Sequence, residues 1–244
     1  MKLLNGATVR TLQFGSIVLA ASALVACGGG TNSGGSPVGT VSGTAAVGAA
    51  LPNASITLTC KNGSGSATAN SNGAYSATFA FDAPCTITAT GGAITIHSIA
   101  AGTGTYNVTP LTELLLDYIA AQLGTTVSGL LAGINSNASY QNALSNSTVI
   151  LNAEAAVAAL IKSKYGITLS SSSFLTVSFT PGQPGADADL DTLLAAGAIT
   201  TNGQPAASLV AAAQAAGAAA PIGSGSSGTT GGTGGTGGSG TTAK

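Results

Sequence analysis

Three cysteines carry the most reactive side chains in this sequence of 244 residues. Cys27 stands at the end of an apolar run and directly before a string of glycines, in the stretch LVACGGG. Cys60 and Cys85 lie instead in segments where apolar and polar residues alternate, which is the pattern of a half-buried strand. The sequence therefore predicts one thiol that is available for modification and two that point into a sheet core.

Strand parity decides how the two later cysteines are oriented. Cys60 shares its face with Ile56 and Leu58, and Cys85 shares its face with Ile87. We therefore expect a disulfide between them if the chain is exported to an oxidising compartment, where it would stabilise the fold by roughly 3 to 4 kcal/mol. Two buried free thiols are the alternative, and a metal site is disfavoured because further ligands are missing nearby.

The remaining chemistry-bearing residues form no recognisable catalytic motif. His97, the single histidine, falls on the polar face of AITIHS, so we expect an exposed strand residue. Glu113 and Asp117 stand one helical turn apart on a predicted polar helix face, and Glu154 is expected to be solvated too. The serines include no G-x-S-x-G nucleophile elbow. An enzyme would need His97 beside an acid or a nucleophile within a cleft.

The run Asp187-x-Asp189-x-Asp191 resembles the start of a calcium-binding loop. Such a loop continues with a glycine and ends with a glutamate at its twelfth position, where this chain has Thr192 and Ala198. Acidic residues that enter a helix N-terminus explain the run more simply, through capping and the helix dipole. We expect no metal and no other cofactor, although the sequence leaves cation binding at the three aspartates open.

Composition excludes one class of partner. Only 5% of the residues are charged and the formal net charge is −1, so no basic patch exists that could neutralise the phosphates of a nucleic acid. The length is ample for a hydrophobic core in one or two domains. A surface that depends on serine, threonine and asparagine suits a protein outside the cytoplasm.

The first 37 residues have the features of an export signal and a linker. Residues 1–26 combine Lys2 and Arg10 with an apolar stretch over 17–26, which is too short to span a bilayer but typical of a secretory signal peptide. A buried core helix is the alternative. Residues 27–37 are dominated by glycine and serine, which predicts a flexible tether.

The stretch Leu24-Val25-Ala26-Cys27 resembles a bacterial lipobox. The resemblance implies transfer of a diacylglyceryl group to the Cys27 sulfur, cleavage before Cys27 and acylation of the new N-terminus. Three acyl chains exceed the two that stable anchoring requires. Gly28 stands where an aspartate would favour retention in the inner membrane, so the resemblance favours an outer-membrane lipoprotein.

Residues 38–108 predict a β-domain. Short alternating segments are separated by the turn signals Asn62-Gly63, Asn72-Gly73 and Gly91-Gly92, as expected of an antiparallel sandwich or a small barrel. The alternating segments are ASITLTC (54–60), GAYSATFAF (73–81), CTITAT (85–90) and AITIHS (93–98).

One residue and two short runs in this segment carry a second resemblance. Gly43, the run Leu51-Pro52-Asn53-Ala54 and the turn Asn72-Gly73-Ala74-Tyr75 occur in the order seen in carboxypeptidase-regulatory-like and transthyretin-like β-sandwich modules. Such modules are usually non-catalytic. The hydrolytic branch of the transthyretin-like family needs His and Arg residues and a C-terminal Tyr-Arg-Gly-Ser motif, which this chain lacks. The resemblance thus implies a binding or spacer role.

Helical periodicity replaces the strand pattern over residues 109–221. Thr109 and Pro110 form a helix start, and the first helix is expected to end at Gly124. A second helix is predicted from about Thr148 to Tyr165, before Gly166. The Thr-Pro-Leu-Thr start resembles a group of uncharacterised proteobacterial lipoproteins. Weaker predictions are one or two short helices within 125–146, an extended connector over 170–180, helices over 187–199 and 205–219, and a disordered tail over 222–244.

The predicted fold class is α+β, with an N-terminal antiparallel β-sandwich of transthyretin or immunoglobulin type followed by an α-helical C-terminal region. The predicted function is a lipid-anchored cell-envelope protein that acts as a non-catalytic binding, adhesion or scaffolding module. Its partners would be the membrane, through Cys27, and an envelope protein or surface ligand. The alternatives are an accessory subunit of an envelope or secretion assembly, and an extracytoplasmic hydrolase.

Overall fold

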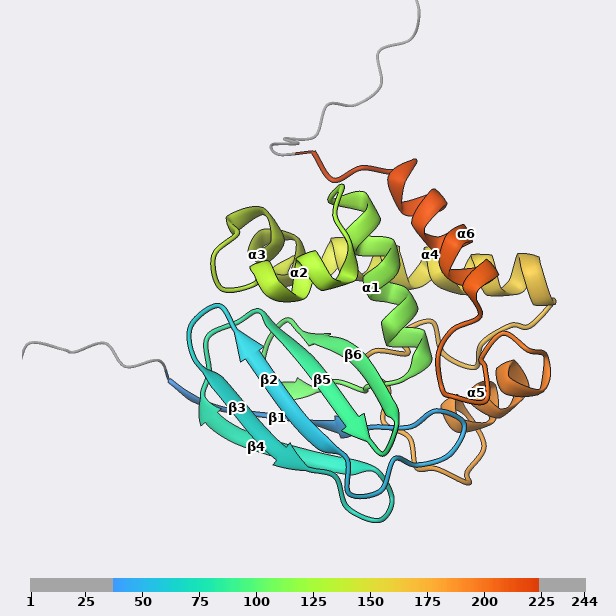
Figure 1. The fold of residues 1–244 in the computed structure, drawn as a ribbon, viewed down its shortest axis with the longest axis horizontal. Coiled ribbons are helices and arrows are strands. Elements are labelled where there is room, and N and C mark those ends of the chain that lie inside the picture. The colour runs from blue at the N-terminus through green and yellow to red at the C-terminus, as the bar shows by residue number, and fades with distance from the viewer. Residues whose placement is uncertain (1–36, 224–244) are drawn as a thin grey trace, which may run out of the picture. The chain divides into compact units, whose positions relative to one another are not determined.

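The computed structural model describes residues 37–223, and within this range it is a mixed α+β fold in which strands precede helices (Figure 1). The strands are β1 (Val38–Thr44), β2 (Ser55–Cys60), β3 (Ser64–Thr68), β4 (Ala74–Ala80), β5 (Cys85–Gly91), β6 (Ile94–Ala100) and β7 (Gly104–Thr105). The helices are α1 (Pro110–Gln122), α2 (Val127–Gly133), α3 (Ala138–Ser145), α4 (Ser147–Tyr165), α5 (Ala186–Ala195) and α6 (Ala207–Ala218).

The strands form two sheets. One has the order β3-β2-β5-β6 and is antiparallel throughout, and the other has the order β4-β1-β7, with β1 antiparallel to β4 and parallel to β7. The predicted turn between β5 and β6 is confirmed, and Gly92 takes a positive φ of 59° there, a conformation that glycine adopts without steric cost. Because β6 comes last in the order β3-β2-β5-β6, it is an outer strand of its sheet.

Apolar side chains from both sheets meet in one buried cluster. Val41 and Tyr75 come from the three-stranded sheet, while Ile56, Leu58 and Ile87 come from the four-stranded sheet. Along β2 buried and exposed residues alternate without exception, which confirms the parity predicted for this strand.

Gly43 explains why one of the positions singled out in the sequence is a glycine. A Cβ at this residue would overlap the carbonyl of Tyr106 and crowd the ring of Tyr75, whose hydroxyl donates to that same carbonyl at 2.5 Å. The segment between β7 and α1 can pass this close to β1 because Gly43 has no side chain.

Helix α1 begins and ends where its sequence predicts. Thr109 is the N-cap, Pro110 occupies the first turn, and Thr109 and Thr112 form a reciprocal capping box. Gly124, with a φ of 66°, follows the last turn. The helix is more enclosed than an amphipathic surface helix, because β6, α4 and α6 all pack against it and ten of its thirteen residues are buried.

The second strong helix prediction is also confirmed. α4 starts after Asn146, whose side chain accepts hydrogen bonds from the backbone of Thr148 and Val149, and it ends at Gly166 in the left-handed conformation. The short helices α2 and α3 occupy the segment predicted to hold one or two. α5 ends four residues before the predicted Ile199, because Gly197 takes a φ of 72° and turns the chain.

Candidate functional site

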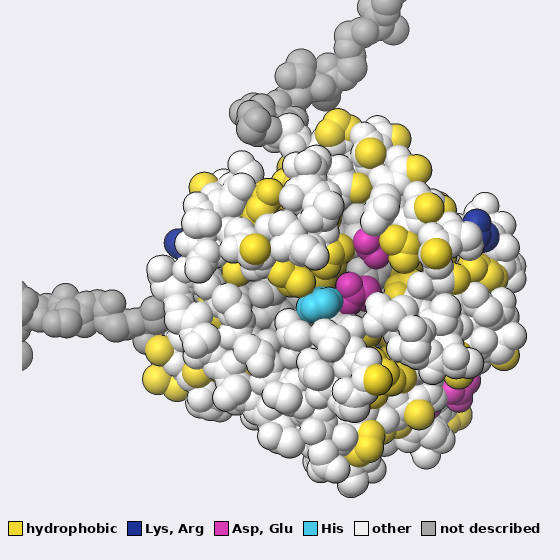
Figure 2. Space-filling model, viewed as in Figure 1, with side chains coloured by type: hydrophobic (Ala, Val, Ile, Leu, Met, Phe, Trp, Pro, Cys, Tyr) yellow, Lys and Arg dark blue, Asp and Glu magenta, His cyan; other side chains and the backbone are white. Residues whose placement is uncertain are grey.

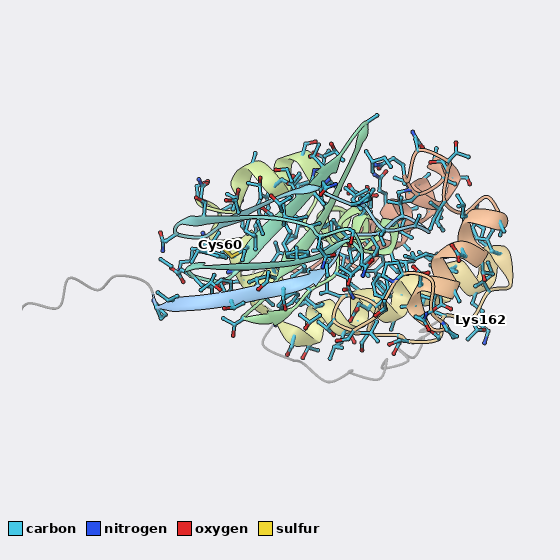
Figure 3. All side chains as sticks on the ribbon, turned by 90° about the horizontal axis from the view of Figure 1, so that it is seen from below. Cys60 and Lys162 are labelled. Carbon is cyan, nitrogen blue, oxygen red and sulfur yellow. A yellow bond between two sulfur atoms is a disulfide. The ribbon has the colours of Figure 1, made fainter. Side chains whose placement is uncertain are left out.

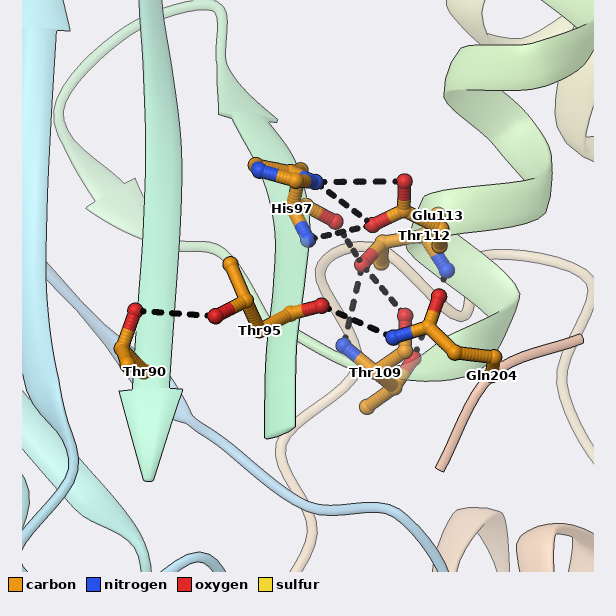
Figure 4. A network of polar contacts seen from close by, with 7 residues as sticks. All are labelled: Thr90, Thr95, His97, Thr109, Thr112, Glu113 and Gln204. Atoms are coloured by element: carbon orange, nitrogen blue, oxygen red, sulfur yellow. Dashed lines mark hydrogen bonds and ion pairs between the residues drawn. The ribbon is translucent and has the colours of Figure 1, made fainter. Parts of the chain in front are cut away.

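The outer edge of β6 is covered by side chains rather than by another strand. The backbone N–H of His97 donates to Oε2 of Glu113 at 2.6 Å, and the hydroxyl of Thr112 lies 2.9 Å from the His97 carbonyl. Gln204, from the loop before α6, donates to the Thr95 carbonyl at 2.8 Å. An edge strand leaves such groups unpaired, and here α1 and a distant loop satisfy them. We refer to Thr95, His97, Thr112, Glu113 and Gln204 as the β6-edge network (Figure 4).

Glu113 also holds the imidazole ring of His97. Nδ1 of His97 lies 2.9 Å from Oε2 and 3.2 Å from Oε1, and the two side chains are 22% and 12% exposed. Figure 2 shows the histidine in contact with an acidic side chain, with a second acidic side chain close by. The prediction that His97 is an exposed strand residue is therefore wrong. The strand face of His97 was predicted correctly, since Ile96 on the opposite face is fully buried. The exposure of His97 was not, because the first turn of α1 covers this face.

The β6-edge network predicts an order of stability among single substitutions. Glu113→Ala should lower the free energy of unfolding by about 1 to 3 kcal/mol, because it leaves the backbone N–H of His97 without its acceptor. His97→Ala should cost about 1 kcal/mol or less, because the partly exposed ring pair is lost while the backbone bond remains. Urea unfolding at neutral pH measures both values.

The exposed Asp191, on α5, supplies the control for this series, and Asp191→Ala should change stability by less than about 0.5 kcal/mol. If His97→Ala proves as costly as Glu113→Ala, the carboxylate does not act mainly through the strand edge.

Asp117 lies one turn beyond Glu113 and is buried against α6. Its Oδ1 accepts a hydrogen bond from Nε2 of Gln214 at 2.9 Å. Burial raises the pKa of Asp117 to about 6, and the nearby charge of Glu113 raises this pKa further, while the bond from Gln214 opposes both. The prediction of a solvated Asp117 is wrong, because α6 packs on this face of α1.

A cavity of about 310 Å³ opens beside Asp117. Ala120 and Ala121 of α1, Thr125 and Thr126 before α2, and Ala218 of α6 contribute to its wall. A second cavity, of about 200 Å³, lies against Lys162 on α4. The Asp117 cavity therefore combines a buried carboxylate with small apolar walls.

The predicted exposure of Glu154 is wrong as well. Its side chain is 2% exposed, and Oε1 accepts the backbone N–H of Leu175 at 2.8 Å. Burial raises the pKa of this carboxyl, and the hydrogen bond from Leu175 lowers it in part. Glu154 fixes the connector over 170–180 to α4, and Phe174 of this connector is buried.

The three aspartates of the 187–191 run do not converge on one point. Oδ2 of Asp187 accepts the backbone N–H of Gly182 at 2.6 Å, while Asp189 accepts both the N–H and the hydroxyl of Ser170. Asp191 is exposed. Residues 37–223 contain no group of His, Cys, Asp or Glu that could hold a metal ion. Asp187 and Asp189 lie in the first turn of α5, as predicted, but no side chain caps this helix, whose N-cap is Gly185.

Cys60 and Cys85 are joined by a disulfide, which confirms the predicted pairing. They face each other directly on the neighbouring strands β2 and β5, with Cα atoms 3.8 Å apart, and both are buried (Figure 3). Lys162 lies well apart from this bond in the same view. The bridge therefore belongs to the β core and not to either cavity.

Sequence reasoning missed the amide side chains that connect distant segments. Asn107 is fully buried and bonds to the backbone of Thr44, Phe174 and Val177. Gln204 and Gln214 supply the partners of β6 and of Asp117. No local pattern could have identified these three residues, because each amide bonds to groups that are more than sixty positions away in the sequence.

The residues of the lipobox, Leu24, Val25, Ala26 and Cys27, lie outside the described residues, as do the signal peptide and nearly all of the predicted tail. Among the helices of the described range, none is by itself both long and apolar enough to cross a membrane. Two sharply bent pairs, α1 with α2 and α3 with α4, meet the length and composition limits only when each pair is taken together.

Comparison with protein-family models, with curated proteins and with solved structures finds no match to this chain. What the site can do must therefore be argued from its own geometry. Within residues 37–223, Nδ1 of His97 is paired with Glu113, and no hydroxyl or thiol group hydrogen-bonds to the ring. The β6-edge network is thus suited to fixing α1 on the sheet, while the Asp117 cavity is suited to holding a small ligand.

Proposed function

We propose that this protein is a lipid-anchored component of a bacterial cell envelope whose folded part, over residues 38–221, is a non-catalytic binding or scaffolding module. The folded part would be a sandwich-like pair of sheets, of the carboxypeptidase-regulatory or transthyretin type, followed by a helical layer. Cys27 would carry the lipid, and the glycine-rich stretch after it would separate the module from the membrane.

The observation that carries this proposal is the buried disulfide between Cys60 and Cys85. Disulfides form and persist in oxidising compartments and are rare in the cytosol. A buried bridge therefore supports export, which the N-terminal signal pattern also predicts. An exported chain with a cysteine after Leu-Val-Ala is a substrate for lipid attachment.

The use of the ionisable side chains supports a non-catalytic role. Glu113, Glu154, Asp187 and Asp189 each accept a backbone N–H from another segment of the chain. Such carboxylates hold the fold together, and their protonation or movement during a reaction would break these contacts. A binding module does not require these carboxylates to change protonation state or to move.

Lipid attachment provides the direct test. Cells that express the protein and receive a fatty-acid analogue should incorporate the label into the wild-type chain and not into Cys27→Ser. The double variant Cys60→Ala, Cys85→Ala is the matched control, because it removes two thiols and keeps Cys27, so it should remain labelled. Equal labelling of wild type and Cys27→Ser would overturn the anchoring proposal.

One observation favours a second candidate, an extracytoplasmic hydrolase. His97 and Glu113 form a hydrogen-bonded pair, and Asp117 follows Glu113 by one helical turn on α1. A histidine oriented by a carboxylate is the arrangement that general-base catalysis uses. Hydrolysis of ester or glycoside substrates that disappears in His97→Ala, while folding is retained, would establish this candidate in place of the first.

A further inference from the structure

The Asp117 cavity lies where two parallel helices end. Three contacts join α1 to α6 and the residues after it: Asp117 with Gln214, Tyr118 with Gly217, and Gln122 with the carbonyl of Ala220. Because the residue numbers rise in the same direction on both sides, the two helices run parallel. The C-terminal ends of both helices therefore lie at the same end of the helical layer (Figure 1). A helix C-terminus carries partial negative charge from its free carbonyls.

Backbone N–H groups of the following residues already bond to the last carbonyls of α1, but no basic side chain of either helix adds a full positive charge. Neither α1 nor α6 has a basic residue in its last turn. Asp117 is the one ionisable residue in the cavity wall, and it adds a full negative charge when ionised. The start of α2 faces the same cavity with the opposite partial charge, but this helix has only seven residues and the Thr126 side chain already accepts the N–H of Gly129.

The charged residues of the described range also favour a cationic ligand. Residues 37–223 include all seven acidic side chains of the protein but only three lysines, Lys61, Lys162 and Lys164, and no arginine. None of these lysines borders the Asp117 cavity. Within residues 37–223, Asp117 is therefore a carboxylate in the cavity wall with no lysine or arginine beside it, an arrangement that favours a cationic ligand.

We propose that this cavity binds a small primary ammonium compound with a short apolar body. The ammonium group would contact the Asp117 carboxylate at the ends of α1 and α6, and the apolar body would lie against Ala120, Ala121 and Ala218. Thr125 also borders the cavity, and its hydroxyl would accept a hydrogen bond from the ammonium group.

The wall chemistry separates this ligand class from other cations. Quaternary ammonium groups are recognised by aromatic cages, and no aromatic residue lines this cavity. Calcium needs about six or more oxygen ligands, whereas Asp117 is the one carboxylate present. A volume of about 310 Å³ is at the lower end of the range for ligand sites, so the occupant must be small.

This inference rests on the proposed binding role of the folded part and is independent of the lipid anchor. It also predicts a dependence on pH. Asp117 has a pKa of about 6, set by burial and by Glu113 and opposed by Gln214, so the carboxylate is charged above that pH and neutral well below it. Affinity for an ammonium compound should fall as the pH is lowered through 6, and a bound cation should lower the pKa of Asp117.

The full-length protein, purified in detergent, can be titrated with n-butylammonium at pH 7.5 by calorimetry and by NMR. n-Butanol and butyrate are the neutral and anionic probes of similar shape. We expect butylammonium to bind at least about tenfold more tightly than either, because a charge-assisted hydrogen bond to Asp117 is available to the cation alone.

Asp117→Asn should weaken binding of butylammonium at least about tenfold, because the amide removes the charge but keeps an oxygen for Gln214. Asp191→Asn is the matched control, since it removes one carboxylate from the exposed side of α5 and should leave the affinity unchanged. Circular dichroism verifies that both variants are folded.

Equal binding of butylammonium and butanol, or an affinity in the wild type that does not fall between pH 7.5 and pH 5, would overturn the inference whether or not Asp117→Asn folds. Failure of the fatty-acid labelling test would remove the anchor and leave this result standing. A cavity that takes no probe, in a chain that is lipid-labelled, would refute the ligand class and leave the envelope location intact.

Discussion

Replacing Cys60 and Cys85 together by alanine is expected to lower the free energy of unfolding by about 3.5 kcal/mol. The disulfide closes a loop between residues 25 positions apart, and loop-closure entropy for that length gives this value. The corresponding drop in melting temperature is roughly 7 to 14 °C for a domain of this size. Alanine is the appropriate replacement because both positions are buried in the apolar β core, where a serine hydroxyl would need a partner.

The wild-type protein unfolded in the presence of a reductant serves as the control for this prediction. It should lose about as much stability as the double variant, because both treatments release the same loop of the unfolded chain. A double variant that matches the oxidised wild type to within about 1 kcal/mol would contradict the prediction, as would free thiols at both positions in protein taken from cells.

Local signals explain which parts of this fold can be predicted from the sequence. α1 and α4 were predicted nearly to the residue, because Thr109, Asn146 and Gly166 carry start and stop information within one helical turn. The facing cysteines were predicted because strand parity depends on the two-residue repeat of a strand and on nothing more distant.

The environments of Glu113, Asp117 and Glu154 could not be predicted in this way. Each is a polar residue in a helix, and the default expectation for such a residue is solvent exposure. Their partners come from a strand edge, from α6 and from the connector over 170–180, at separations of 16, 97 and 21 positions. Burial of these acids depends on which element packs over the helix, and that information lies outside the helix sequence.

The candidate site, too, could be predicted from the sequence only in part. The residues His97, Glu113 and Asp117 were identified from the sequence as possible participants, but their mutual arrangement was not. The cavity beside Asp117 depends on α1 and α6 running in parallel, with Gly217 close against the backbone at Tyr118. This close approach requires a residue without a side chain at one position in α6.

Asn107 is the buried residue whose replacement we expect to be as costly as loss of the disulfide. Its Oδ1 accepts the N–H of Thr44 at 3.2 Å, and its Nδ2 donates to the carbonyls of Phe174 at 3.1 Å and Val177 at 2.7 Å. Asn107 thereby ties the end of β1 to the connector between α4 and α5.

Asn107→Ala should lower the free energy of unfolding by about 3 kcal/mol or more, because three backbone groups lose their partners at a fully buried position and each unsatisfied group costs about 1 to 3 kcal/mol. Denaturant unfolding measures the loss. Asn152→Ala, at an exposed position within α4, is the matched control and should change stability by less than about 0.5 kcal/mol.

The damage in Asn107→Ala should also be local. With the connector released from Asn107, chymotrypsin should cleave after Phe174 or Phe179 much faster than in the wild type, because cleavage requires local opening of that segment. The disulfide double variant compared at equal overall stability should not show this preference, since its defect lies between β2 and β5. Equal cleavage of the connector in both variants would mean that Asn107 contributes to global stability without anchoring this segment.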